Sequence, residues 1–347
     1  MRKLKPLKIG YFADGIWAHN AFEKLISCND FHIAFITPRF YSTDETLKTL
    51  ATTYNIPYIK AKNINSPAFL SQIAAFECDI FVSMSFDQIF KEPLISMPRL
   101  KSINCHAGKL PFYRGRNVLN WVLINDEKSF GISVHYIDSG IDTGDIILQR
   151  EFPISDEDCY STLLHTAHTE CAQVLFSALM LLHKGEAKPI KQTDIHKIGF
   201  YCPARIAGDE WIHWDKPSRF IFNFIRALNA PDLGALTQVC TQGDTFKVRI
   251  FKAHFLSNAP CYIATPGVIV GIQKREGHKP ILIVKTQDST ISISEYITEA
   301  KLRIGDRFFT PIGYEHNILT GGGDKVKNTP IIPAYRPHKA PPKRWVA

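Results

Sequence analysis

An amide, an imidazole and a carboxylate stand at a spacing that could support acyl transfer to an amine. Asn104 and His106 are separated by one residue, and Asp142 follows in the segment GIDTGD. Attack of an amine on an acyl carbon creates a negative oxygen, to which an amide can donate a hydrogen bond. It also creates an ammonium, whose proton a neutral imidazole can accept. A neighbouring carboxylate would orient the ring and stabilise the imidazolium.

The sequence around this triad resembles that of the formyltransferases that use 10-formyltetrahydrofolate, which carry an Asn, any residue, His pair and a distant Asp before Thr-Gly. The resemblance covers roughly residues 8 to 310 through four further blocks in the family's order: KIGYFADGIWAHNAFEKL, SMSFDQIFKEPL, LNWVLIN and YCPARIAGDEWIHWDKPSRFIFNFIRALNAPDLGA. Chance does not give blocks of this length in this order. The resemblance implies an N-formyltransferase with Asn104, His106 and Asp142 as its catalytic residues.

The same resemblance implies where the cosubstrate, N10-formyltetrahydrofolate, binds. The family holds the pterin ring with main-chain atoms of the segment SMSFDQIF. Arg116 and residues 138–141, which precede Asp142, would also contact the folate. The candidate folate-binding residues are Met84, Ser85, Phe86, Arg116, Asp138, Ser139, Gly140 and Ile141.

Two segments offer contacts for the acceptor substrate. In GKLPFYRGR, Lys109, Tyr113 and Arg114 stand directly after the triad histidine, and the cations could meet phosphates or the carboxylate tail of a folate. In FADGIWAHN, Asp14 and Trp17 lie between the first predicted strand and the first helix, a position suited to anion or sugar contact. Trp17 is equally compatible with a place in the core.

The sequence gives weaker support to a cysteine nucleophile and to a metal site. Cys105 could be a nucleophile, but neighbouring residues of a strand point to opposite faces, which favours core packing for this thiol. His165, His168 and Cys171 recur at steps of three on one helix, yet structural zinc usually needs four ligands and no second cluster is visible. The segment at Gly10 and Gly15 lacks the three spaced glycines of a dinucleotide site. We predict neither a metal nor a nicotinamide cofactor.

The acceptor amine is left open among the classes that the family includes: initiator methionyl-tRNA, nucleotide-linked amino sugars, hydroxyornithine-type siderophore precursors and, with water as the acceptor, hydrolysis of the cosubstrate. The tRNA enzymes resemble one another in a basic insertion after the second strand. Here that region reads TPRFYSTDETLKTLATTYNIP, in which Arg39 and Lys48 are balanced by Asp44 and Glu45. The footprint for an RNA stem is absent there. A nucleotide-linked amino sugar is therefore the leading acceptor, and a folate-pocket protein without chemistry is the alternative that is not an enzyme.

The net charge of +8 belongs to the two ends of the chain. Residues 1–8 contribute +4 and residues 321–347 contribute +5, so residues 9–320 carry 8 − 4 − 5 = −1. A nearly neutral body argues against a nucleic-acid partner. No apolar stretch approaches the length of a membrane span. The eight scattered cysteines form no framework, so we expect reduced thiols and a cytoplasmic location. The oligomeric state is not readable, and a homodimer remains open.

Short apolar runs alternate with helix-length periodic segments in the first half of the chain, which predicts a doubly wound, mostly parallel α/β sheet. The expected strands are 8–13, 31–37, 57–60, 79–84, 102–105, 131–138 and 145–154. Long helices are expected at about 159–184, ending before Gly185, and at 218–228. Such a sheet binds ligands beyond the carboxyl ends of its strands, where the triad would emerge.

The second half predicts a smaller, β-rich domain. Residues 265–270, 281–285 and 290–293 alternate apolar and polar side chains, with Gly271 and Gly277 at the turns, which indicates a small sheet or barrel. We expect a catalytic domain over residues 1–199, a barrel-like domain over 200–320 and a basic, Pro- and Gly-rich tail over 321–347.

Overall fold

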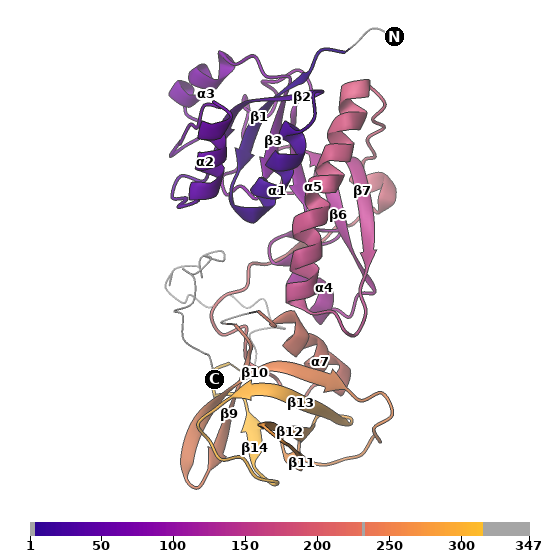
Figure 1. Cartoon of the computed structure of the whole chain (residues 1–347). Coiled ribbons are helices and arrows are strands. Elements are labelled where there is room, and N and C mark those ends of the chain that lie inside the picture. Colours follow the sequence, from indigo (N-terminus) through magenta and orange to yellow (C-terminus); the bar gives the residue numbers. More distant parts are fainter. Residues whose placement is uncertain (1–3, 231–232, 315–347) are drawn as a thin grey trace.

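The computed structural model describes residues 4–230 and 233–314, and its first layer is a six-stranded sheet with the order β2-β1-β3-β4-β6-β7 (Figure 1). Its strands are β1 (Leu7–Ala13), β2 (Phe31–Thr37), β3 (Ile80–Met84), β4 (Ser102–His106), β6 (Ser129–Tyr136) and β7 (Ile146–Pro153). The strands β1 to β4 are parallel, whereas β6 pairs antiparallel with β4 and β7 pairs antiparallel with β6. The predicted doubly wound, mostly parallel fold is confirmed.

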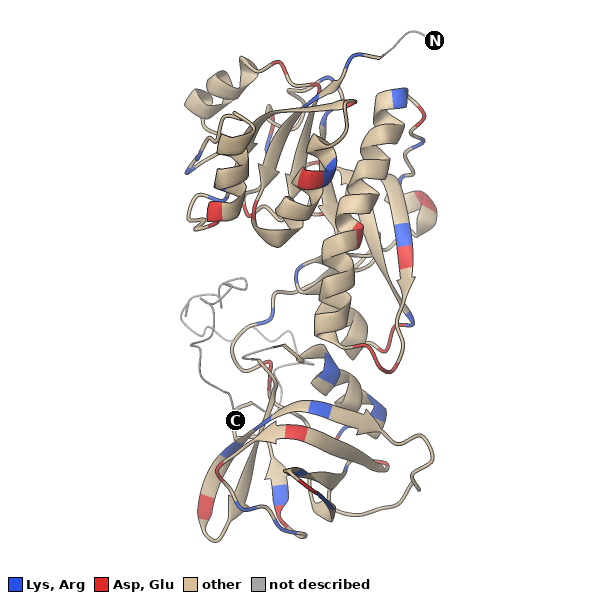
Figure 2. Cartoon of the chain, in the orientation of Figure 1, with Lys and Arg blue, Asp and Glu red and all other residues tan. Residues whose placement is uncertain are grey.

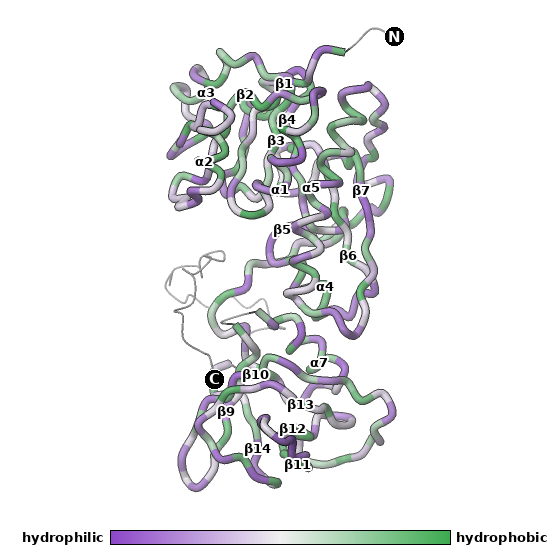
Figure 3. Tube along the Cα trace, in the orientation of Figure 1, coloured by the Kyte–Doolittle hydropathy of each residue, from purple (hydrophilic) through white to green (hydrophobic). Residues whose placement is uncertain are grey.

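Helices cover both faces of this sheet because its strands bury residues on both sides. In β1, Tyr11 belongs to the core cluster shared with α1 and α5, whereas Phe12 joins a second cluster with Phe35 and Phe81. Hydrophobic stretches follow these strands in Figure 3. The helices of this part are α1 (Gly15–Ile26), α2 (Glu45–Thr53), α3 (Pro67–Ala74), α4 (Val118–Ile124), α5 (Tyr160–Lys184) and α6 (Gln192–Ile195).

The boundaries of the long helix α5 follow its sequence signals. Cys159 is the N-cap, and its backbone N–H donates a hydrogen bond to Thr162 Oγ1 at 3.0 Å. Gly185 ends the helix in the left-handed conformation, with φ of 69°, which glycine adopts at little cost. The predicted limits of this helix are therefore confirmed.

The C-terminal part is a second, antiparallel six-stranded sheet with the order β11-β12-β13-β10-β9-β14, approached by helix α7 (Ser218–Ala227). Its strands are β9 (Ala235–Thr241), β10 (Asp244–Phe255), β11 (Ile269–Arg275), β12 (His278–Lys285), β13 (Thr290–Ile297) and β14 (Arg307–Phe309). The sheet forms an antiparallel half-barrel, as the composition predicted.

The two parts meet along α4 and α7 (Figure 1). The guanidinium of Arg219 at the start of α7 donates to Asp126 at 2.5 and 2.9 Å and to Asp156 at 2.6 and 2.7 Å. A short strand pair also joins them, because β5 (Arg114–Gly115) pairs in parallel with β8 (Tyr201–Cys202). The predicted domain boundary after residue 199 stays a prediction, and the chain just beyond it packs on the loop that follows the triad histidine.

Prediction and structure differ at four places. The strand expected over residues 265–270 begins only at Ile269, as β11, and continues to Arg275. Residues 57–60 form only an isolated bridge between Tyr58 and Ile36, because Pro57 has no N–H to extend a ladder. Gly271 lies inside β11 at a register shift, whereas Gly277 is at the turn, with φ of 68°. The strands β9, β10 and β14 were not predicted, although in β10 Phe246, Val248 and Ile250 alternate with polar residues.

Two further predictions concern the C-terminal tail and membrane-spanning segments. The basic tail predicted over residues 321–347 lies outside the described residues. In the part of the chain that is described, no helix combines the length and the apolar character that crossing a membrane requires.

Candidate active site

The carboxyl end of β4 presents Asn104 and His106, as the alternation of a strand requires. Asn104 lies opposite His135 of β6, and His106 lies opposite Ser133. Cys105, between them, is only 7% exposed and belongs to the core, where its Sγ lies 3.6 Å from the carbonyl oxygen of Cys171. The thiol therefore faces away from the triad, as predicted.

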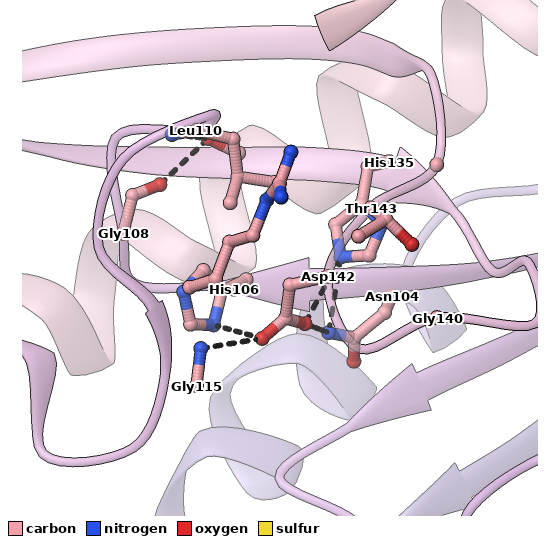
Figure 4. A network of polar contacts seen from close by, with 12 residues as sticks. Asn104, His106, Gly108, Leu110, Gly115, His135, Gly140, Asp142 and Thr143 are labelled. Carbon is pink, nitrogen blue, oxygen red and sulfur yellow. Dashed lines mark hydrogen bonds and ion pairs between the residues drawn. The ribbon is translucent and has the colours of Figure 1, made fainter. Parts of the chain in front are cut away.

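Asp142 meets both residues of β4 (Figure 4). Its Oδ1 is 3.4 Å from Asn104 Nδ2 and 3.4 Å from His135 Nε2, and its Oδ2 is 3.7 Å from His106 Nδ1. The backbone N–H of Gly115 donates to Oδ2 at 2.9 Å. The structure thus brings together the three residues that lie 38 positions apart at most in the sequence.

The electrostatics of this group keep Asp142 ionised. Burial alone would raise the pKa of Asp142, but the charge of a protonated His106 and the contacts with His135 and Gly115 outweigh burial. The pKa of the carboxyl is therefore held well below its usual range. An anion here can stabilise a cation that forms on a neighbouring imidazole.

His106 is 9% exposed, and its second nitrogen has a different partner. Nε2 lies 2.7 Å from the main-chain carbonyl oxygen of Tyr113. The loop that supplies this carbonyl is tied down at Gly108, whose own carbonyl accepts a hydrogen bond from Ser133 Oγ at 2.7 Å. The His106 imidazole is thus contacted from both sides, by a carboxylate and by a carbonyl.

The three acceptor-binding candidates of this loop have protein partners. Lys109 Nζ lies 2.7 Å from Glu151. The phenol of Tyr113 is buried and donates to Glu127 at 2.5 Å, and burial together with this carboxylate raises its pKa. Arg114 donates to Gln192 Oε1 at 2.6 and 3.0 Å. Substrate contacts for Lys109, Tyr113 and Arg114 stay a prediction, and each would compete with a contact that the fold already makes.

Two positions that support Asp142 were not predicted. Gln192 is 3% exposed, and its Nε2 donates to the carbonyl oxygens of Asp142 and Gly144 at 2.8 and 2.9 Å. It lies 50 residues beyond Asp142 in a segment that reads as a polar connector. His135 is 2% exposed and could have been found, because it shares a face of β6 with Ser133 at the period of a strand.

The predicted folate segments lie at the same edge of the sheet. Residues 138–141 form an exposed loop closed by Asp138 Oδ1, which accepts from Gly140 N at 3.0 Å and Thr143 Oγ1 at 2.5 Å. Ser85, at the end of β3, has φ of 56°. Arg116 is exposed, and within residues 4–230 and 233–314 its guanidinium has no hydrogen-bond or ion-pair partner. These groups fit a folate: they offer an open loop, main-chain groups at a strand end and a cation for a carboxylate tail.

Met84 and Phe86 flank this position from inside the fold. Met84 is 1% exposed, and Phe86 packs on Phe12 and Phe90 with ring centroids 5.7 and 6.2 Å away. Their side chains are therefore core residues. This is compatible with the main-chain recognition that was predicted for them, which stays a prediction.

A second polar group stands at the ends of β1 and β2. Asp14 is 9% exposed, and its Oδ1 has no hydrogen-bond partner among the described residues. Its Oδ2 is 3.9 Å from Arg39 Nε, and Arg39 also donates to Ser85 O and Oγ at 2.9 Å each. Burial, and then the charges of Asp44 and Asp87, raise the pKa of Asp14 against the opposing effects of Ser42 and Arg39.

Trp17 takes a packing position. Its ring meets the ring of His168 on α5 edge-on, with centroids 4.4 Å apart, and it packs against the main core. His168 thus contacts an aromatic ring, and Cys171, on the same helix, is 1% exposed in the core. Stacking of Trp17 on a substrate stays a prediction.

Comparisons with known proteins agree with this geometry. The model of the formyl transferase family matches residues 37–179, and the model of the formyl transferase C-terminal domain matches residues 206–309. The methionyl-tRNA formyltransferase of Fusobacterium nucleatum subsp. nucleatum is 33% identical over 257 residues, which cover 74% of this chain and 78% of that protein. The bifunctional polymyxin resistance protein ArnA of Wigglesworthia glossinidia brevipalpis is 29% identical over 74% of this chain and 37% of that protein.

Fold and site together define a group-transfer enzyme with a two-part formyltransferase architecture. The chain belongs to the formyl transferase family, and it is an N-formyltransferase. Formyl-tetrahydrofolate is the cosubstrate of this family, as the sequence resemblance implied.

Solved structures share the fold. WlaRD, a sugar 3N-formyl transferase solved with dTDP and 5-N-formyl-THF, aligns with a TM-score of 0.60 at 24% identity, over 85% of this chain and 99% of that one. The N-formyltransferase of Helicobacter canadensis, solved with folinic acid and dTDP-3-aminofucose, aligns with a TM-score of 0.61 at 22% identity, over 84% and 100% of the two chains. At these identities the likeness establishes the fold.

Proposed function

We propose that the chain transfers the formyl group of N10-formyltetrahydrofolate to the primary amine of a nucleotide-linked amino sugar. The observation that carries the formyl transfer is the group formed by Asn104, His106 and Asp142, in which Asp142 lies 3.4 Å from the amide nitrogen and 3.7 Å from the ring nitrogen. The acceptor class rests on the charge of the neighbouring loops.

The triad can supply what the reaction needs. A bond forms between the amine nitrogen and the formyl carbon, one N–H bond of the amine breaks, the bond from that carbon to N10 breaks, and the proton passes to N10. Asn104 has two amide hydrogens. The amide nitrogen lies 3.4 Å from Asp142 Oδ1 and 3.4 Å from His135 Nε2, so one hydrogen can stay on Asp142 while the other leaves the long contact with His135 and donates to the oxyanion. His106 can hold the proton between the two steps, beside an anionic Asp142.

Asp14 supports recognition of an extended acceptor. It stands at the end of β1, two strands from β4 in the sheet, and neighbouring strands are about 4.8 Å apart, so Asp14 lies about 10 Å from the triad along the edge. Thr37 Oγ1, at the end of the adjacent β2, is also buried without a partner among the described residues. A buried carboxylate oxygen and a hydroxyl without partners favour a ligand that donates hydrogen bonds, such as the hydroxyls of a sugar.

The loop after β2 argues against an RNA acceptor. Its Arg39 is engaged by Ser85 and Asp14, and the following helix α2 begins with an acidic pair, of which Asp44 caps the helix and Glu45 lies 3.2 Å from Lys48. Figure 2 shows Lys and Arg interspersed with Asp and Glu over both parts of the chain. Binding a tRNA stem requires a surplus of exposed cations.

Methionyl-tRNA is the second candidate acceptor, because the proteins with 30 to 33% identity that match most of the chain are named methionyl-tRNA formyltransferases. Formyl transfer to an amine is common to both candidates. The distinction therefore rests on groups outside the triad.

The test is a turnover assay with 10-formyltetrahydrofolate and a panel of dTDP-, UDP- and GDP-linked amino sugars, followed by product mass. Methionyl-tRNA and a reaction without acceptor serve as parallel arms. We expect one nucleotide sugar to gain one formyl group. Formylation of methionyl-tRNA would show that the acceptor is the tRNA and not a sugar. Deformylation of 10-formyltetrahydrofolate without an acceptor would identify a hydrolase.

A variant separates recognition from chemistry in the same assay. Asp14→Asn keeps the size of the side chain and removes its charge, so we expect a higher KM for the nucleotide sugar at an unchanged KM for the folate. Asp244→Asn, a change at an exposed carboxylate of β10 in the C-terminal sheet, is the control. A selective rise in the folate KM would instead place Asp14 in the folate site.

A further inference from the structure

We propose that Gly108 and the main-chain carbonyl of Tyr113 lock His106 in the tautomer with hydrogen on Nε2, so that Nδ1, on the side of Asp142, accepts the amine proton. This inference rests on the proposed function, in which His106 holds that proton. Gly108 and Tyr113 act here as positioning residues, through the imidazole, and neither needs to touch a substrate.

The tautomer follows from the partner of Nε2. A carbonyl oxygen accepts hydrogen bonds and cannot donate one. The distance of 2.7 Å between Nε2 and Tyr113 O is that of a hydrogen bond, so Nε2 must carry the hydrogen. A neutral imidazole has one N–H, and Nδ1 is therefore left with its lone pair.

The contact with Asp142 is of a different kind. Nδ1 and Asp142 Oδ2 are 3.7 Å apart, which is longer than a hydrogen bond and short enough for an ion pair. The carboxylate already accepts from Gly115 N at 2.9 Å. Asp142 is therefore placed to stabilise positive charge on the ring, while the carbonyl of Tyr113 sets the orientation of the ring.

Gly108 is what makes the lock possible. A Cβ at this position would lie 2.4 Å from His106 Nε2 and 2.4 Å from Tyr113 O, too close to both atoms of the hydrogen bond between them. Either His106 Nε2 or Tyr113 O would have to move. Any side chain at this position therefore opposes the contact.

The carbonyl of Tyr113 is held independently of His106. Tyr113 has φ of 53°, and its phenol is fixed by Glu127 at 2.5 Å and by Asn125 at 3.3 Å. The carbonyl of Gly108 is fixed by Ser133 at 2.7 Å. Because both sides of the loop are anchored, a tautomer that turned a lone pair toward Tyr113 O would lose this hydrogen bond, and its Nδ1–H would face Asp142 Oδ2 only at 3.7 Å, beyond hydrogen-bond distance.

The lock decides where the proton goes. One N–H bond of the attacking amine breaks, its electron pair stays on the nitrogen, and the lone pair of Nδ1 forms the new N–H bond. The new cation then lies next to the Asp142 carboxylate. Return of the same proton to N10 regenerates the neutral ring with its hydrogen on Nε2, so the base is reset without rotation of the ring.

Long-range nitrogen–proton NMR of the histidine-labelled full chain tests the lock directly, with the His106→Gln variant assigning the signal. We expect neutral His106 to show hydrogen on Nε2. Hydrogen on Nδ1 would overturn the proposal. This readout does not depend on turnover, so a chain that shows the Nε2–H tautomer and formylates no amine would refute the proposed function and leave the lock standing.

Substitution of Gly108 gives the second readout. We expect Gly108→Ala to populate the other tautomer and to lower kcat by about 10²-fold at an unchanged folate KM. Gly271→Ala in β11 is the control, because a Cβ at this position would meet only Ile283, at 3.3 Å, in the C-terminal sheet. A Gly108→Ala variant with wild-type tautomer and wild-type kcat would contradict the proposal. Should Gly108→Ala fail to fold, the NMR signal of the wild-type chain decides alone.

Discussion

The backbone N–H of Gly115 donates a 2.9 Å hydrogen bond to the carboxylate of Asp142. Gly115 is one residue of β5, the two-residue strand that pairs with Tyr201 and Cys202. The triad carboxylate is thus supported by a contact between the loop after β4 and the segment that leads to the C-terminal sheet. A displacement of Gly115 should therefore displace the carboxylate of Asp142.

We therefore expect Gly115→Ala to lower turnover by up to about 10²-fold, since small displacements of catalytic groups have effects of that size. The residue has φ of 91°, and an added Cβ would lie 2.6 Å from Cys202 O. Gly243→Ala is the control, because Gly243 has the same φ and no atom within 4 Å of such a Cβ. Equal turnover of the two variants would show that the contact with Asp142 is dispensable.

Replacing Gln192 by Leu should weaken both stability and turnover. The change leaves the buried carbonyls of Asp142 and Gly144 without their donor, at a cost of about 1–3 kcal/mol in the free energy of unfolding. Urea unfolding measures this loss. Gln72→Leu, on the exposed face of α3, is the matched control, and a Gln192 variant as stable as that control would refute the role given to Gln192.

Arg219 should couple the two parts of the chain in a pH-dependent manner. Burial would raise the pKa of Asp126, but hydrogen bonds from Arg219 outweigh it and lower that pKa to about 2. Since the folded pKa is below the unfolded value of about 3.9, the stabilisation is present above that value and is lost as pH falls toward 2. We expect Arg219→Met to lower the melting temperature at pH 7 and to differ less from wild type near pH 2. A pH-independent difference would contradict this.

His168 should contribute to acid lability. Burial first, and then the neighbouring His165, lower the pKa of His168 to about 4. The unfolded chain takes up this proton near pH 6.5 and the folded chain only near 4, so stability is full above 6.5 and falls as pH drops between these values. We expect His168→Gln to lose less melting temperature than wild type between pH 7.5 and pH 5. The exposed His278→Gln serves as the control, and equal losses in all three proteins would exclude His168 as the cause.

The fold could be predicted from local patterns, and the positions of the triad from their match to the family motif. Apolar runs such as 31–37 mark buried strands, and the spacing of Asn104 and His106 places both on one face of β4. The remainder depends on partners that are distant in the sequence. In the sequence, Lys109 is a cation and Tyr113 an aromatic residue, each without an evident partner. Only the fold brings Glu151 to Lys109 and Glu127 to Tyr113.

The orientation of the catalytic imidazole is a further case. Nothing in the sequence indicates that the carbonyl of Tyr113 turns back onto His106, because this requires a positive φ at a tyrosine and a glycine two residues after the histidine. The role of Gln192 could not be predicted either, because its partners are distant in the sequence. Its role depends on the return of the chain from α5 to the Asp142 loop.

The most direct test of the central claim is the turnover of Asp142→Asn with 10-formyltetrahydrofolate and the acceptor found productive for the wild-type chain. The substitution keeps the shape of the side chain and removes the charge beside His106. We predict a loss of turnover of at least about 100-fold with little change in the unfolding curve. Wild-type turnover by a folded Asp142→Asn chain would contradict the account.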